Sequence, residues 1–187
     1  MIKNALIVHG VYGSPNENWF PWLKDELEKL GWQVFAPQFP TPEGHNLENW
    51  LKVFDGYKKY LDKNSIVVGH SMGVSFLLSV LEILDRPIKA AFFVAGFADF
   101  LGVDEEIDKL NTTFLDKHFN WEKIKQNCPE FYVFQSDNDP YIPMKKAKEL
   151  AGNLGTRVTL VKGAGHFNKV AGYTKFELLL DKIKEVV

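Results

Sequence analysis

The feature that most restricts the fold of this chain is a regular alternation along its length. Six short runs rich in apolar and β-branched residues are separated by longer segments in which apolar residues recur at helical spacing. Two runs, at residues 66–68 and 92–94, are apolar at consecutive positions, as expected for strands covered on both sheet faces. The pattern predicts an α/β fold, a three-layer sandwich with a mostly parallel six-stranded sheet and helices on both faces.

The bounds of the expected elements follow from these runs and from the residues that interrupt them. Strands are predicted at residues 5–8, 33–36, 65–68, 90–95, 131–135 and 157–161. Helices are predicted at residues 19–30, 47–62, 74–84, 145–151 and 173–186, with stop signals at Gly31, Pro87 and Gly152. A chain of 187 residues has the size of one domain, so residues 1–187 are expected to form a single domain.

One long connection interrupts the alternation. Residues 96–127 mix aromatic side chains with several acidic ones and show no strand pattern. Connections of this length in compact domains are often functional, which favours a short lid-like excursion over the sheet. A pair of ordinary surface helices is the alternative interpretation. We call this segment the 96–127 excursion.

Composition and charge exclude several classes of protein. The formal net charge is −2 with both signs interspersed, which argues against nucleic acid or anionic lipid as a partner. Cys128 is the only cysteine, which excludes an intramolecular disulfide and a cysteine-rich zinc site and fits a reducing compartment. The first residues do not resemble a signal peptide, and no apolar run approaches the ~20 residues that span a bilayer. A cytoplasmic protein without membrane contact is therefore expected.

The sharpest local motif lies between the third predicted strand and the following helix. Residues 69–73 read Gly-His-Ser-Met-Gly and match the G-x-S-x-G nucleophile elbow, which requires this strand-to-helix context. Glycines permit the tight turn, and a helix N-terminus favours developing negative charge. An ordinary helix N-cap serine is the plainer interpretation. Ser71 is the candidate nucleophile.

Two further residues stand where partners of such a serine are expected. Asp139 lies in the loop after the fifth predicted strand, and His166 lies in the loop after the sixth. Open parallel sheets build their sites at the carboxyl ends of strands, and the order Ser, acid, His is that of a hydrolase triad. Ser71 would be the nucleophile, His166 the general base and Asp139 the acid that orients it. Asp137, two positions earlier, and Asp99, after the fourth strand, are the competing acids.

The remaining histidines carry no metal-binding pattern. His9 and His70 flank the proposed site and are expected to hold loops by hydrogen bonds, whereas His45 and His118 are expected in solvated loops or helices. The sequence contains no H-E-x-x-H motif and no Cys/His pair at ligand spacing. No metal and no cofactor are therefore expected.

A group of aromatic residues follows the first strand. Trp19, Phe20 and Trp22 begin the first predicted helix, close to the loop that would border the site. They could line a pocket for an acyl group. Aromatic side chains at helical spacing are more often part of the core, and this alternative remains open at the level of sequence.

Taken together, four motifs resemble the α/β-hydrolase superfamily: His9-Gly10, residues 69–73, Asp139-x-x-Ile142-Pro143 and Gly165-His166-Phe167. The short chain without an inserted cap domain is similar to the small serine hydrolases of the retinoblastoma-binding protein nine and YdeN type. The resemblance implies a hydrolytic fold without a cofactor. It also implies an oxyanion hole formed by the backbone N–H groups of Val11 and Met72, with Tyr12 as the alternative if the loop is shifted by one residue.

The expected function is hydrolysis of a small ester or amide through an acyl-enzyme formed by a Ser-His-Asp triad. Carboxylesterase activity is favoured, and thioesterases or peptidases would use the same residues. The alternative is a hydrolase-fold module that binds a protein partner and makes little use of the triad. A nucleotide-binding domain is disfavoured, because residues 9–13 lack a G-x-G-x-x-G turn and a Walker lysine.

Overall fold

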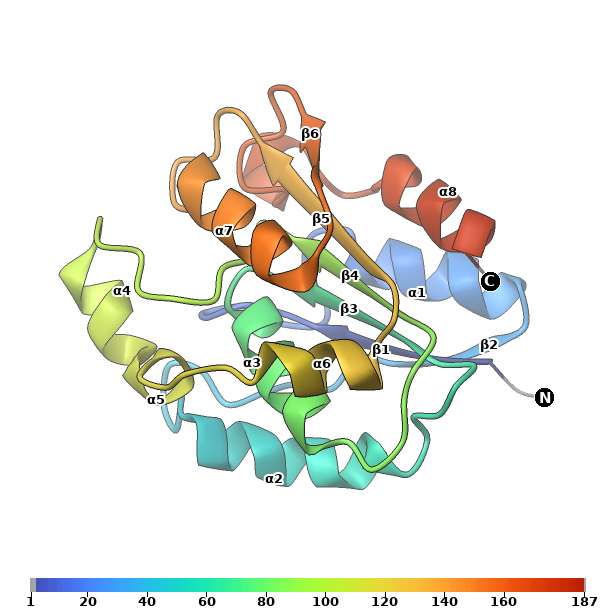
Figure 1. Ribbon diagram of the computed structural model, residues 1–187. Coiled ribbons are helices and arrows are strands. Elements are labelled where there is room, and N and C mark those ends of the chain that lie inside the picture. Colours follow the sequence, from blue (N-terminus) through green and yellow to red (C-terminus); the bar gives the residue numbers. More distant parts are fainter. Residues whose placement is uncertain (1–2, 187) are drawn as a thin grey trace.

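A computed structural model describes residues 3–186 and contains one parallel sheet with helices on both faces (Figure 1). The strands are β1 (Lys3–Val8), β2 (Trp32–Phe35), β3 (Ile66–His70), β4 (Ala90–Val94), β5 (Phe131–Ser136) and β6 (Val158–Val161). Their order is β2-β1-β3-β4-β5-β6, and every neighbouring pair is parallel. The predicted α/β sandwich is confirmed. Residues 1, 2 and 187 of the predicted domain lie outside the described part.

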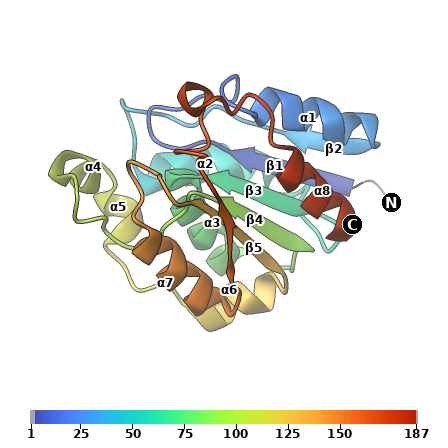
Figure 2. The same ribbon diagram turned by 90° about the horizontal axis from the view of Figure 1, so that it is seen from above.

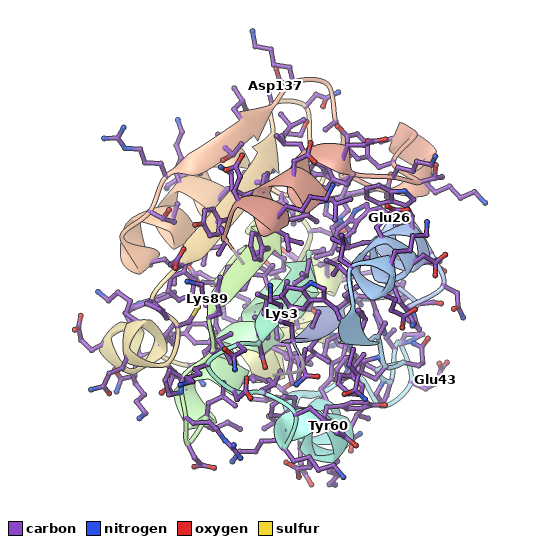
Figure 3. The ribbon with its side chains drawn as sticks, turned by 90° about the vertical axis from the view of Figure 1, so that its right-hand side faces the viewer. Lys3, Glu26, Glu43, Tyr60, Lys89 and Asp137 are labelled. Carbon is purple, nitrogen blue, oxygen red and sulfur yellow. The ribbon has the colours of Figure 1, made fainter. Side chains whose placement is uncertain are left out.

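The strand order creates a crevice beside β1. The chain runs from β1 to β2 on one side and then returns to β3 on the other, so the connections after β1 and β3 leave the sheet in opposite directions. Ligand sites of open α/β sheets form at such a reversal, outside the carboxyl ends of the strands. Figure 3 faces the opposite end of the sheet, where Lys3 opens β1 and Lys89 precedes β4.

Alternate side chains of the strands enter two separate core layers. Leu6 and Val8 pack with α2 (Leu47–Lys58), α3 (Met72–Ile83), α6 (Trp121–Asn127) and α7 (Met144–Leu154). Ala5 and Ile7 pack on the other face with α1 (Phe20–Lys29) and α8 (Glu177–Val186). Figure 2 shows α1 and α8 together on one side of the sheet. All residues of β3 and β4 are buried, as their continuous apolar runs predict.

Three predicted helix bounds are wrong by three or four residues. Helix α2 ends at Lys58 rather than at residue 62. The other two errors have conformational reasons. Helix α7 continues through Gly152 and ends before Gly155, which adopts the left-handed conformation with φ 73°. A glycine stops a helix only where the chain takes that conformation, so Gly152 is not the stop. Helix α8 begins at Glu177 rather than at residue 173, because Gly172 at φ 84° closes a short 3₁₀ helix, Lys169–Ala171, just before it.

The 96–127 excursion divides into two parts. Its last helix, α6, belongs to the layer beside α3, and the buried Asn127 donates from Nδ2 to the carbonyl oxygens of Leu81 and Leu84 at 2.7 and 3.0 Å. The first part contains α4 (Glu105–Leu110) and α5 (Thr112–Leu115). Figure 1 shows α4 standing away from the sheet, and none of its residues is buried. A lid role therefore concerns the part before α6.

Candidate active site

Ser71 occupies a strained turn between β3 and α3. Its backbone has φ 55° and ψ −127°, a region that non-glycine residues rarely adopt, and its N–H donates to Val94 O at 2.9 Å. The neighbouring backbone approaches so closely that side chains cannot fit. A Cβ at Gly73 would lie 2.5 Å from His9 O, and a Cβ at Gly10 would lie 2.9 Å from Ser71 Cβ. Gly73 of the elbow motif and Gly10 of the loop after β1 thus leave room for this conformation.

His166 and Asp139 meet across the loops after β6 and β5. His166 Nδ1 lies 2.9 Å from Asp139 Oδ2 and 3.1 Å from Oδ1. Asp139 Oδ1 also accepts the backbone N–H groups of Tyr141 at 2.9 Å and Ile142 at 3.1 Å. The carboxylate side chain is 1 % exposed and the imidazole 11 %. The acid is thus held by its own loop and directed at one nitrogen of His166.

These contacts keep Asp139 ionised. Burial by itself raises the pKa of the carboxyl group, but the hydrogen bond and charge of His166 and the two backbone N–H groups outweigh it, and the net pKa is lowered. An ionised carboxylate can only accept, so Nδ1 of His166 carries the proton that it donates. The other ring nitrogen, Nε2, has no hydrogen-bond partner among residues 3–186, and His166 borders the two cavities that Ser71 also borders.

The competing acids have other partners. Asp137 Oδ1 accepts the backbone N–H of Gly163 at 2.8 Å, and Figure 3 shows Asp137 at the upper periphery of the molecule. Asp99 Oδ2 lies 3.2 Å from Lys146 Nζ. Among the three carboxylates weighed from the sequence, Asp139 is the one that contacts His166.

Sequence reasoning missed two residues that join the same loops. Ser136 Oγ accepts the N–H of Ala164 at 3.0 Å, and Asn138 Oδ1 accepts the N–H of Gly165 at 2.8 Å. Ser136 Oγ also donates to Asn138 Oδ1 at 2.7 Å. The sequence feature that could have revealed these two residues is the run of Ser, Asp and Asn after a strand, since such side chains commonly bind nearby backbone. Here they bind backbone 27 and 28 residues away and fix the loop that carries His166.

The backbone N–H groups proposed for an oxyanion hole differ in whether they already donate a hydrogen bond. Tyr12 N–H donates to Thr41 Oγ1 at 2.9 Å and is occupied. The N–H groups of Val11 and Met72 have no acceptor among residues 3–186. Met72 is the first residue of α3, where N–H groups are unpaired and the helix dipole favours negative charge. This bonding pattern favours Val11 over Tyr12.

His70 and His9 hold neighbouring loops, as expected. His70 Nε2 donates to the carbonyl oxygen of His166 at 2.8 Å, and burial lowers the pKa of His70 to about 3. His9 Nε2 accepts the N–H of Phe39 at 3.0 Å, so Nδ1 carries the proton and donates to Gly10 O at 2.7 Å. Burial also lowers the pKa of His9. Both imidazoles are neutral structural groups.

The prediction of a solvated His45 is wrong. His45 is buried, and its Nε2 lies 2.9 Å from Asn111 Oδ1. Its ring packs against Trp50 and Phe114 with centroid separations of 5.2 and 4.8 Å. The surrounding Pro- and Gly-containing sequence suggested a surface loop, but α5 from a distant part of the chain covers it. His118 is exposed, as predicted.

The aromatic residues of the first helix divide between core and cavity. Trp19 is fully buried, and its Nε1 donates to Phe167 O at 2.9 Å, next to His166. Trp22 packs against the same core layer as α1 and α8. Phe20 is buried and lines a cavity beside Ser71. The core interpretation thus holds for the two tryptophans.

Two cavities meet at Ser71. The first has a volume of about 420 Å³ and is lined by the loop after β1 and by residues 168–170. The second has a volume of about 430 Å³ and extends under the first part of the 96–127 excursion, where Phe97, Leu101 and Ile107 line it. Ser71 and His166 border both cavities, so a substrate with two parts can reach the serine from both sides.

Two other features, a metal site and a membrane-spanning helix, are absent from the described residues. Within residues 3–186 no three His, Cys, Asp or Glu side chains come together in a way that could hold a metal ion. No helix in this part of the chain is long and apolar enough to cross a membrane.

Comparison with known proteins agrees with this geometry. Residues 5–185 match the serine hydrolase family. The chain is 31% identical to the hydrolase YdeN of Bacillus subtilis (strain 168) over 97% of its own length and 94% of that protein. It is 28% identical to serine hydrolase RBBP9 of Rattus norvegicus over 98% of its length and 95% of the relative. The crystal structure of the ydeN gene product from B. subtilis superposes with a TM-score of 0.91 at 29% identity, covering 98% of both chains. The chain therefore belongs to the serine hydrolase family.

Proposed function

We propose that this chain hydrolyses small carboxylic esters through an acyl-enzyme formed on Ser71. The observation that carries the proposal is the Asp139–His166 pair, bonded at 2.9 Å and bordering the same cavities as a serine in a strained elbow. Membership of the serine hydrolase family supports the same chemistry.

In this mechanism Ser71 Oγ attacks the carbonyl carbon of the ester while His166 Nε2 takes its proton. Asp139 keeps the imidazole in the required tautomer and stabilises the cation that forms. The N–H groups of Val11 and Met72 bind the oxyanion. His166 then gives the proton to the departing alkoxide, and a water activated by the same nitrogen releases the acid and restores the serine.

The size of the site admits small esters. Cavities of about 420 and 430 Å³ on the two sides of Ser71 suit short acyl and alcohol groups. Thioesters and amides are cleaved through analogous tetrahedral intermediates, so the same residues would serve all three substrate classes. Turnover of an ester, a thioester and an amide with the same acyl group tests the carboxylesterase assignment directly.

The test compares wild type with Ser71→Ala by fluorophosphonate labelling and by hydrolysis of p-nitrophenyl acetate. The wild type should be labelled and active, whereas Ser71→Ala should show neither. Ser14→Ala is the matched control, because the Ser14 hydroxyl accepts the N–H of Asn16 in a local turn and has no other partner among residues 3–186. It should behave like wild type. Labelling of Ser71→Ala would assign the nucleophile elsewhere. A folded wild type without labelling or turnover would favour the protein-binding module.

A further inference from the structure

Gln135 places an amide in a row of apolar side chains on β5. Phe131 and Val133 occupy the two preceding alternate positions and enter the core layer that also contains residues of α7. Gln135 continues this row and has no exposed surface. A buried amide is costly unless it is hydrogen-bonded, so the partners of Gln135 indicate its role.

The nitrogen of this amide has two acceptors, and both belong to the loop that follows β5. Gln135 Nε2 donates to Ile142 O at 2.9 Å and to Asp139 Oδ2 at 3.3 Å. A backbone carbonyl and an ionised carboxylate can only accept hydrogen bonds, so both contacts require the NH₂ group on this side. The orientation of the amide is therefore fixed by its neighbours.

One of these contacts reaches the carboxylate oxygen that also faces His166. His166 Nδ1 lies 2.9 Å from Asp139 Oδ2, whereas Oδ1 accepts the N–H groups of Tyr141 and Ile142. Those two donors belong to the same loop as the acid and move with it. Gln135 instead belongs to β5, which pairs with a strand on each side. Its bond thus connects Oδ2 to the sheet.

The oxygen of the amide shows that an apolar residue would suit this position better in one respect. Gln135 Oε1 is buried and has no hydrogen-bond partner among residues 3–186. An unpaired buried acceptor is unfavourable, and a side chain like those of Phe131 and Val133 would avoid it. Departures from the local pattern next to reacting groups are expected where a residue serves function.

We infer that Gln135 is a positioning residue that holds the Asp139 carboxylate against His166 during ester hydrolysis. Its donated bond fixes Oδ2 relative to the sheet, and Oδ2 in turn fixes the imidazole that accepts the proton of Ser71. Catalytic groups are held accurately when their supporting contacts come from a rigid element. This inference rests on the proposed esterase function and adds the residue that aligns its acid.

The first test removes the donor. Gln135→Met has a side chain of similar length and no N–H group, so kcat/KM for p-nitrophenyl acetate should fall about ten- to hundredfold, as small displacements of catalytic groups do. Val133→Ala is the matched control, because it disturbs the same row of β5 without a bond to the acid. It should lower the thermal midpoint and keep the wild-type kcat/KM.

The second test separates hydrogen bonding from space filling by the pH profile of Gln135→Glu. His166 and His70 are the titratable groups whose charges interact with Asp139. The introduced carboxyl group would be buried against a carboxylate and a carbonyl oxygen, which favours its protonated form. While protonated it can donate to Asp139 Oδ2, and once ionised it repels that atom.

Gln135→Glu should therefore exceed Gln135→Met in kcat/KM at pH 6 and lose this advantage by pH 9. Its profile should be bell-shaped, whereas that of the wild type should rise to a plateau as His166 loses its proton. Gln126→Glu is the matched control, because Gln126 is exposed on α6, and it should keep the wild-type profile.

The outcomes separate the inference from the function on which it rests. A folded Gln135→Met with wild-type kcat/KM would overturn the inference alone. A Gln135→Glu profile parallel to that of Gln135→Met at every pH would show that the side chain only fills space, with the same consequence. Thermal midpoints identify the folded variants, and Gln135→Asn, which withdraws the NH₂ group by one CH₂, replaces an unfolded methionine variant. Absence of turnover in the wild type would overturn the proposed function and the inference together.

Discussion

At the scale of single residues, backbone packing against the elbow leaves no room for an added methyl group at Gly73. A Cβ there would lie 2.5 Å from His9 O and 2.6 Å from Val8 O, both backbone atoms that cannot rotate away. Gly73→Ala should therefore destabilise the fold by about 1–3 kcal/mol, as overpacking does, and should displace Ser71. Thermal unfolding and p-nitrophenyl acetate hydrolysis measure the two effects.

Gly152 provides the matched control for this change. It lies inside α7, and a Cβ there would meet nothing within 4 Å. Gly152→Ala should raise the stability by up to ~1 kcal/mol, because alanine is the better helix former, and should leave turnover unchanged. If Gly73→Ala were as stable and active as Gly152→Ala, the close approach of the backbone oxygens of Val8 and His9 to Gly73 would be contradicted.

The identity of the acid is a second prediction at this scale. Asp139→Asn should keep the fold but lower kcat by orders of magnitude, since the amide no longer holds the imidazole tautomer; the same change in chymotrypsin-type triads costs ~10⁴. Asp137→Asn and Asp99→Asn should lose little, because these carboxylates bind Gly163 and Lys146 instead. Measuring kcat/KM and the thermal midpoint of each of the three variants identifies the acid. Large losses in Asp99→Asn or Asp137→Asn beside an active Asp139→Asn would reassign the acid.

At the scale of elements, the first part of the 96–127 excursion is shaped by one carboxylate. Asp108 Oδ1 accepts the N–H of Leu101 at 2.7 Å, and Oδ2 accepts that of Gly102 at 2.8 Å. Leu101 lines the second cavity, so these bonds hold part of its wall. A segment with few buried contacts can open locally without global unfolding.

Asp108→Ala should therefore lower kcat/KM for p-nitrophenyl pentanoate severalfold, with a smaller effect on the acetate and a small change in thermal midpoint. Asp181→Ala on α8 is the control, because Asp181 makes an exposed ion pair with Lys184 at 3.5 Å that contributes little. Equal losses for acetate and pentanoate would contradict a role of this segment in binding the longer chain.

At the scale of the whole molecule, buried neutral histidines make stability depend on pH. Burial lowers the pKa of His9, His45 and His70, to about 3 for His70. Below the ordinary imidazole pKa of ~6.5 the unfolded chain binds protons that the folded chain does not. Their contribution is therefore fully present above about pH 6.5 and is lost as the pH falls, by up to ~1.4 kcal/mol per pH unit for each histidine.

The measurement is the free energy of unfolding by urea between pH 6.5 and 5, above the range in which carboxylates titrate. His70→Gln retains a donor for the carbonyl of His166 and should reduce the slope by about one proton, ~1.4 kcal/mol per pH unit. His118→Gln changes an exposed ring and should keep the wild-type slope. A slope in His70→Gln equal to wild type would mean that His70 is protonated in the folded protein.

Local pattern and chain order were enough to identify the fold and the candidate residues. The apolar runs of β3 and β4 predict buried strands because burial on both faces leaves no polar alternation. Ser71 stands out because a strand, two glycines and a helix lie within a few residues of it. His166 and Asp139 were found by their positions after successive strands, since parallel strands bring those loops to one edge of the sheet.

Contacts between distant segments were decided only by the tertiary structure. Three carboxylates fit the sequence pattern of the acid, and the one that reaches His166 is set by how the β5 and β6 loops fold against each other. The burial of His45 and its bond to Asn111 span 66 residues, so no local periodicity encodes them. The sequence by itself determined the strands, most of the helices and the candidate serine motif, because these depend on neighbouring residues. The tertiary structure decided partners, burial and cavity walls, because these depend on which distant side chains pack together.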